Sequence, residues 1–145
     1  MLFTTHILSA LLLGKYLGHT GAIVLGSTLI DFDHIFDMIV KGKKHGFRRT
    51  LEVLFTPYPE EDESRTVFHS ILGWLVISAV LYAIMPSFGI YFSAGYLLHL
   101  VLDSLDTSRL RLFYPQKYDI RGWVEYNSLT EYILAIIMFI IYFFF

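Results

Sequence analysis

The chain has 145 residues, of which 55% are hydrophobic, 17% aromatic and only 17% charged, and its formal net charge is −2. A soluble domain usually carries about 25% charged residues, whereas the mean hydropathy of this chain is +0.56. These values exclude a disordered chain and a nucleic-acid-binding domain with a basic surface, and they predict a protein embedded in lipid.

Five apolar segments follow one another along the chain, separated by turns or polar loops. They cover residues 2–17, 22–40, 67–85, 88–105 and 128–145. At 1.5 Å per residue the first segment reaches roughly 24 Å, which is short of a typical hydrocarbon core of about 30 Å. We predict one all-α domain over residues 1–145, a polytopic membrane bundle of four or five helices.

The basic residues are concentrated in two polar loops, 41–65 and 106–127. The first loop contains six lysine and arginine residues and the second contains four, whereas the Gly18–Gly21 and Pro86–Ser87 turns contain none. The positive-inside rule therefore predicts that both loops are cytoplasmic. With up-and-down connections, the N-terminus is then cytoplasmic and the C-terminus lies outside.

Ionisable side chains are costly inside transmembrane segments and usually mark a functional site or pathway. Here they fall at one depth, although successive segments run in opposite directions. The set comprises His6, Asp31, Asp33, His34, His69, His99, Asp103 and Glu131. His99 and Asp103 are four residues apart, so they share one helix face. Asp31 and His34 are three apart and do the same, but Asp33 points about 200° away from Asp31.

Histidine nitrogen together with carboxylate oxygen suits Zn²⁺, Mn²⁺ or Fe²⁺. Cysteine is absent, so a metal site cannot use thiolates and no disulfide framework exists. Two other interpretations stay open, namely polar pairs that tie helices together and a proton relay of the transporter kind. His19, in a turn at the far end, and His45, in a basic loop, are predicted to be solvated.

Four short motifs occur in the order and spacing of a known family. They are Thr5-His6, Ile30-Asp31-Phe32-Asp33-His34, the run Ser64–Ser70, and His99 to Asp103 continuing to Tyr114-Pro115. Over about residues 4–115 the chain resembles the membrane-bound metal-dependent hydrolases of the YdjM type. Their motifs are Thr-His, P-D-x-D-H, H-R-x-x-T-H-S and H-x-x-x-D. That family in turn resembles zinc-dependent phospholipase C and related nucleases, which bind two or three metals with clustered His and Asp.

The chain departs from the family pattern at several positions. Ile30 replaces a proline, Ser64 the first histidine of the third motif, and Phe68 its threonine. Asp106 stands where threonine is usual and Arg109 where glycine is usual. Ser64 removes one possible ligand, so a degenerate site is an alternative. Asp106 is either a new ligand or a helix-end residue.

The resemblance implies metal-dependent hydrolysis of a phosphoester, such as one in a lipid headgroup, in a prokaryotic cell membrane. The expected metal ligands are His6, Asp31, Asp33, His34, His69, His99 and Asp103, with zinc as the expected ion and manganese or iron as alternatives. Asp33 is either a bridging ligand or the general base. Arg65 either clamps a phosphate or anchors the chain at the membrane surface.

The alternative function is a non-enzymatic membrane protein, either a metal or proton carrier or a bundle that binds a partner. Membrane lipid is the expected partner, and no nucleic acid partner is predicted. A carrier needs access from both faces, whereas the ionisable residues lie in the inner half of the predicted bundle. This distribution favours a site that opens to one side.

Overall fold

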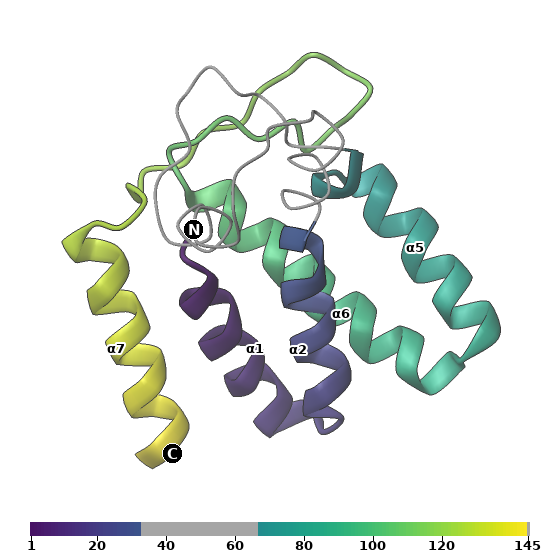
Figure 1. The fold of residues 1–145 in the computed structure, drawn as a ribbon, viewed down its shortest axis with the longest axis horizontal. Helices are drawn as coiled ribbons and strands as arrows, with labels where there is room; N and C mark the ends of the chain where they lie inside the picture. The colour runs from purple at the N-terminus through teal and green to yellow at the C-terminus, as the bar shows by residue number, and fades with distance from the viewer. Residues whose placement is uncertain (33–66, 145) are drawn as a thin grey trace, which may run out of the picture.

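The computed structural model describes residues 1–32 and 67–144, and the regular structure in this part of the chain is helical (Figure 1). The prediction of an all-α chain is therefore confirmed for these residues. The elements are α1 (Phe3–Leu17), α2 (Thr20–Thr28), the 3-10 turns η1 (Leu29–Asp31) and η2 (Val67–His69), α5 (Ile71–Ile84), α6 (Pro86–Leu105) and α7 (Leu129–Phe144).

The helices differ in whether they are long enough to cross a bilayer. In the described part of the chain, α6 alone is both long and apolar enough, with 20 residues. Helices α1, α5 and α7 have 15, 14 and 16 residues, below the range of about 17–25 typical of membrane-spanning helices. The predicted apolar segments are helical as far as the structure describes them, with residues 33–40 of the second segment outside the described residues, while the crossing of the bilayer by each helix stays a prediction.

Two predicted boundaries are wrong because of capping. Pro86 was expected in a turn but opens α6, since a first helical position needs no amide donor and suits the fixed φ of proline. Met85 alone separates α5 from α6. Helix α5 begins at Ile71 rather than at Val67, because the Ser70 hydroxyl accepts the Gly73 amide at 3.1 Å and caps the helix there.

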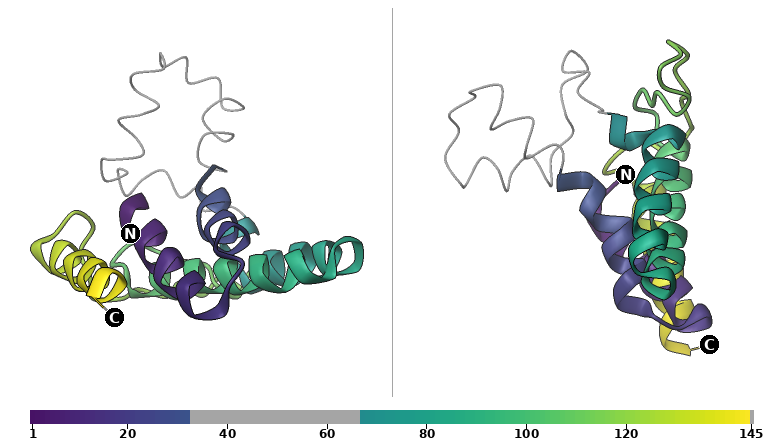
Figure 2. Two further views of the ribbon diagram at one scale, coloured as in Figure 1. Left: turned by 90° about the horizontal axis from the view of Figure 1, so that it is seen from below. Right: turned by 90° about the vertical axis from the view of Figure 1, so that its right-hand side faces the viewer.

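Successive helices alternate in direction, so five chain segments meet at one end of the bundle. These are the start of α1, the end of α2 with η1, the start of α5, the end of α6 and the start of α7 (Figure 1). Figure 2 shows a flat arrangement, in which α2 packs on one side against α1 and α6. Helices α5 and α7 form the two edges.

Helix α2 approaches α6 closely, and this approach depends on two glycines. A Cβ atom on Gly26 would overlap the Phe92 carbonyl, and one on Gly95 would overlap the Ile23 carbonyl. Because all the obstructing atoms are backbone, no side-chain movement relieves the clash. This close crossing brings the end of α2 beside the last two turns of α6.

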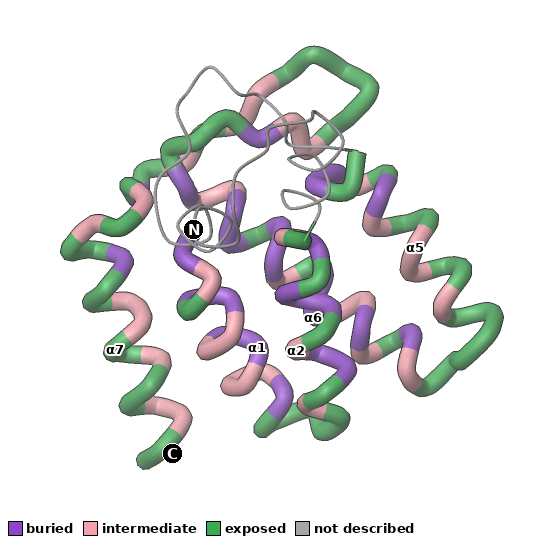
Figure 3. The backbone as a smooth tube through the Cα atoms, viewed as in Figure 1, coloured by how far each residue is buried: buried purple, intermediate pink, exposed green. Residues whose placement is uncertain are grey.

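The edge helices expose most of their apolar side chains. Figure 3 shows buried residues concentrated on α1, α2 and α6, whereas α5 and α7 are largely exposed or half-buried. Val76 on α5 and Ile136 on α7 are 55% and 57% exposed. In a soluble protein such contiguous apolar surface is unusual, and in a membrane protein it faces lipid.

The 106–127 loop is more ordered than a solvated polar loop. Leu110 and Ile120 exchange two backbone hydrogen bonds, and the Val124 amide donates to the Leu105 carbonyl at 2.8 Å. Leu110 and Val124 are completely buried. The loop therefore folds over the end of α6. The other predicted loop, 41–65, lies outside the described residues.

Candidate metal centre

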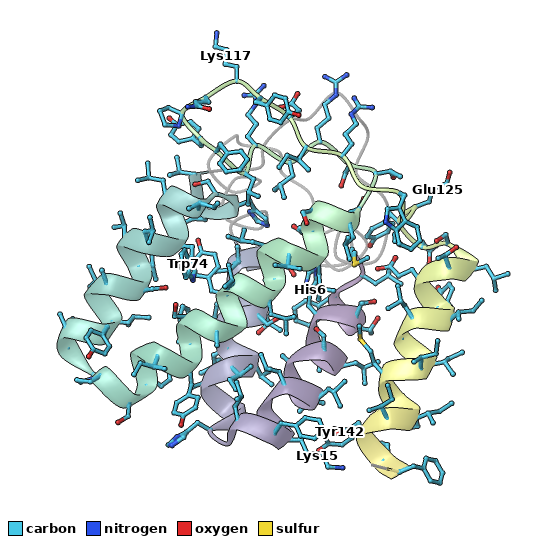
Figure 4. All side chains as sticks on the ribbon, turned by 180° about the vertical axis from the view of Figure 1, so that it is seen from behind. His6, Lys15, Trp74, Lys117, Glu125 and Tyr142 are labelled. Carbon is cyan, nitrogen blue, oxygen red and sulfur yellow. The ribbon has the colours of Figure 1, made fainter. Side chains whose placement is uncertain are left out.

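Five of the predicted ligands come together at the end of the bundle where the helix ends meet. His6 lies on α1, Asp31 on η1, His69 on η2, and His99 and Asp103 on α6. The His and Asp103 side chains are buried, whereas Asp31 is 16% exposed. Figure 4 shows His6 inside the bundle, on the side toward the 106–127 loop that carries Lys117.

Two histidines lie beside two carboxylates. The Nε2 atom of His99 lies 3.5 Å from Asp103 Oδ2 and 3.6 Å from Asp31 Oδ1. The Nε2 atom of His69 lies 3.7 and 3.8 Å from the same two oxygen atoms. Ligand atoms about 2.0–2.2 Å from a tetrahedral zinc ion lie about 3.3–3.6 Å from one another. The distances from His99 to the two carboxylates are close to those required around a small divalent cation, although Asp31 and Asp103 fall in different groups with metal-ligand spacing.

The Ser27 carbonyl orients the His99 ring. The Nδ1 atom of His99 lies 2.7 Å from the Ser27 carbonyl oxygen. A carbonyl only accepts, so Nδ1 carries a proton, and Nε2 is the ring nitrogen that faces the cluster and would bind a metal. Helix α2 ends at Thr28, the residue after Ser27, and the 3-10 turn η1 follows. In a 3-10 turn the amides bond three residues back instead of four.

The Nε2 atom of His99 is buried and has no hydrogen-bond partner among the described residues. It faces Asp31 and Asp103, whose ionised carboxylates can only accept. Such buried groups need a proton on the ring or a cation between them. A bound cation would meet this need and balance the two carboxylate charges, so the donor set fits a divalent metal.

His6 also belongs to the cluster, but it faces the other oxygen atom of the Asp103 carboxylate. Its ring stacks on His99 with centroids 4.1 Å apart, and its Nε2 lies 3.3 Å from Asp103 Oδ1. His6, Asp31 and His99 form one group with metal-ligand spacing, and His69, His99 and Asp103 form another. The two groups share His99, so His6 is a candidate ligand of a fifth position or of a second ion.

Several predicted residues fall elsewhere. Asp33, His34 and Arg65 lie outside the described residues, as does His45. His19 is exposed at the opposite end of the bundle, where it stacks on Tyr91 with centroids 4.2 Å apart.

Asp106 behaves as a helix-end residue. It follows the last residue of α6, and its Oδ1 accepts from both the amide and the hydroxyl of Ser108 at 2.8 Å. Its Oδ2 lies 2.6 Å from the Met1 amino nitrogen, which also lies 3.2 Å from Asp103. Burial raises the pKa of the Asp106 carboxyl, but the amino group and Ser108 outweigh burial and hold that pKa below its usual value.

Glu131 lies at the same end of the bundle as the cluster, and it holds α1 and α7 together beside the cluster without being part of it. It is completely buried. Its Oε1 accepts the Leu2 amide at 2.5 Å and the Thr5 hydroxyl at 3.3 Å, and its Oε2 accepts the Asn127 amide at 2.8 Å. The carboxylate thus satisfies a free amide at the start of α1. It ties α7 to the turn of α1 that carries His6.

One contributor was not found from the sequence. It is Ser27, which acts through its backbone carbonyl on His99 and donates its hydroxyl to the His6 carbonyl at 3.2 Å. Tyr126 in the 106–127 loop was not singled out either. Burial, followed by the carboxylates of Glu131, Asp106 and Asp31, raises the pKa of its phenol to about 12. Tyr126 therefore keeps its proton at neutral pH. No short motif signals either residue.

Comparison with known proteins identifies one family. The family model described as YdjM inner membrane protein matches residues 1–145 of the chain. No curated protein and no solved structure is similar enough to count as a match.

Proposed function

The chain belongs to the YdjM inner membrane protein family, and from this membership and the buried cluster we propose that it is a membrane-embedded metal-dependent hydrolase. The proposed substrate is a phosphoester, such as one in a lipid headgroup. Zinc is the proposed ion, with manganese or iron as alternatives, because the donors are imidazole nitrogen and carboxylate oxygen.

The observation that carries the proposal is the orientation of His99. Its proton is held on Nδ1 by the Ser27 carbonyl, and its Nε2 atom is directed at two carboxylates in a buried site. A ring whose Nδ1 donates to a carbonyl while its Nε2 faces two carboxylates has the arrangement of a metal ligand with a supporting hydrogen-bond partner.

The described residues would divide the work as follows. Asp31, His69, His99 and Asp103 would hold the ion, and His6 would complete its surroundings from the far side of Asp103. A bound divalent ion lowers the pKa of its water from 15.7 to about 7 and offsets charge on a phosphoryl oxygen. The Ser27 carbonyl and Glu131 would keep the His99 and His6 rings in position.

Two proposed roles rest on residues outside the described part. Asp33 is proposed as the general base that takes the proton of the attacking water, or as a further ligand, and His34 as a further ligand. Arg65 is proposed to clamp a phosphate oxygen through its planar fork. Both proposals come from the family motifs.

The proposed membrane orientation places the cluster near the cytoplasmic face. The basic loops 41–65 and 106–127 would lie in the cytoplasm under the positive-inside rule. The N-terminus would be cytoplasmic and the C-terminus outside, and these ends lie at opposite ends of the helices in Figure 1.

The experiment compares the intact chain with Asp33→Asn in liposomes with added Zn²⁺ or Mn²⁺, using a phosphodiester reporter and phosphatidylcholine as substrates. We expect metal-dependent hydrolysis by the unmodified chain. Asp33→Asn should keep its metal and lose about 10²–10⁴-fold in rate, since an amide cannot accept the proton. Product release and metal content are measured on the same samples.

His19→Ala is the control, because His19 lies at the opposite end of the bundle. Both the rate and the metal content should be unchanged in that variant. If metal binds but no ester is cleaved, and metal instead crosses the liposome membrane, the protein is a carrier and the hydrolase proposal is wrong. Loss of metal in Asp33→Asn would make Asp33 a ligand and leave the base unassigned.

A further inference from the structure

Two helices whose ends are both described are short for a membrane protein. Helices α1 and α5 have 15 and 14 residues, which correspond to about 21–23 Å. A typical hydrocarbon core is about 30 Å thick, so these two helices are shorter than the core by about 7–9 Å.

The longer helix α6 is compatible with a thin apolar zone. Helix α6 has 20 residues, enough for about 30 Å, but Figure 1 shows it running obliquely past α1 and α2. Its Tyr91 stacks on His19 at the α1–α2 turn. The segment from Tyr91 to Leu105 therefore covers the same depth as the shorter helices.

Polar and amphipathic residues mark both ends of the apolar zone. At the end away from the cluster, Lys15 donates to the Tyr142 carbonyl at 2.5 Å, and its Nζ lies 5.3 Å from the centre of the Tyr142 ring. Tyr16 at this end is 64% exposed. Figure 4 shows Lys15 and Tyr142 at the end opposite Lys117. Lysine and tyrosine are the residues that settle at a membrane–water interface.

The distance along the bundle between the His/Asp cluster and Lys15 is small. His6 and Lys15 are nine residues apart on one helix, which is about 14 Å along the axis. In a bilayer of ordinary thickness, with Lys15 held at one interface, the buried His/Asp cluster would lie near the midplane. Ionisable groups at that depth are costly.

We propose that the bundle thins the bilayer around it, matching a hydrocarbon thickness of about 20–24 Å. The partner surface is the bilayer itself. It contacts the exposed apolar side chains of α5 and α7, bounded by Lys15 and Tyr142 at one end and by the 106–127 loop at the other. Thinning resolves the mismatch between short helices and a thick core without placing Lys15 in hydrocarbon.

This deformation also bears on the substrate, a step that rests on the proposed function. Lipid phosphates on the side of the cluster are drawn toward its level, so a headgroup ester reaches the cluster without leaving its leaflet. The bilayer preference itself needs no metal, so its test is independent of hydrolysis.

The test reconstitutes the full chain in phosphatidylcholine bilayers whose acyl chains run from about 14 to about 22 carbons, and measures the midpoint of thermal unfolding. We expect the midpoint to be highest in the shortest chains and to fall by about 5 °C or more toward the longest. A maximum in the longest chains, or no dependence on chain length, overturns the proposal.

A pair of lysine variants sharpens the test. Lys15→Leu removes the anchor at the far end and should move the optimum to longer acyl chains. Lys117→Leu, in the exposed 106–127 loop, should leave the optimum where it is. The position of the optimum is compared rather than its height, because Lys15→Leu also removes a contact to α7. If the optimum of Lys15→Leu stays at the same acyl-chain length, Lys15 does not set the thickness that the bundle prefers, and the proposal is wrong on this point.

Discussion

Asp103→Ala should reduce metal affinity by about 100-fold or more, the largest effect expected of any single substitution in the described cluster. Asp103 lies within 3.7 Å of the Nε2 atoms of His6, His69 and His99, so its carboxylate lies beside all three histidines of the cluster. Zinc added to the unmodified chain should raise the unfolding midpoint, because a ligand that binds the folded state stabilises it. That rise should be absent in Asp103→Ala.

Asp119→Asn is the matched control. Asp119 is also a carboxylate, in the 106–127 loop beyond α6, but it pairs with Arg111 at 3.3 Å near the surface. Its zinc response should equal that of the unmodified chain. An undiminished zinc response in Asp103→Ala would remove this residue from the site.

Gly26→Ala should destabilise the fold by about 3 kcal/mol, a large effect for one added methyl group. The new Cβ would overlap the Phe92 carbonyl on α6, with the Tyr96 amide nitrogen 3.0 Å away. Helices α2 and α6 must therefore move apart. Because Asp31 follows α2 and His99 lies on α6, zinc affinity should fall as well. Unfolding by denaturant measures the first effect and zinc titration the second.

Gly21→Ala on the same helix provides the comparison. A Cβ on Gly21 meets nothing within 4 Å, so this change should be neutral or stabilising by about 0.5–1 kcal/mol through helix propensity. If the two variants were equally stable, the close approach of α2 and α6 would be wrong.

The convergence of the ionisable residues could be predicted because it depends only on helix direction and spacing. His99 and Asp103 are one turn apart on α6, and alternating helices bring the start of α1 to the same level. The resulting expectation, that His6 and Asp103 lie close together, agrees with the 3.3 Å separation of their side chains. Their role as metal ligands stays a prediction.

Other features could not be predicted because they depend on backbone contacts between distant segments. The Ser27 carbonyl reaches His99 only because Gly26 and Gly95 let α2 approach α6. No side-chain pattern at Ser27 announces this contact. The burial of Leu110 and Val124 likewise comes from the fold of the 106–127 loop over the end of α6.

The ends of some helices could be predicted and those of others could not. The predicted segments 2–17 and 128–145 agree closely with α1 and α7, and the expected turn at Gly18 ends α1. The segment 67–85 is longer than α5, because capping at Ser70 starts that helix at Ile71. Local hydrogen bonds and backbone conformation, rather than hydropathy, decide where each helix stops.

The most direct test of the account is the metal content of the intact chain, purified in mild detergent without chelators and measured by elemental analysis. The cluster predicts about one zinc, manganese or iron ion per chain, or two if His6 serves a second ion. Removal of that metal by a chelator should lower the unfolding midpoint, and readdition should restore it. Less than about a tenth of a metal ion per chain, with no change of the midpoint on adding zinc, would contradict the account.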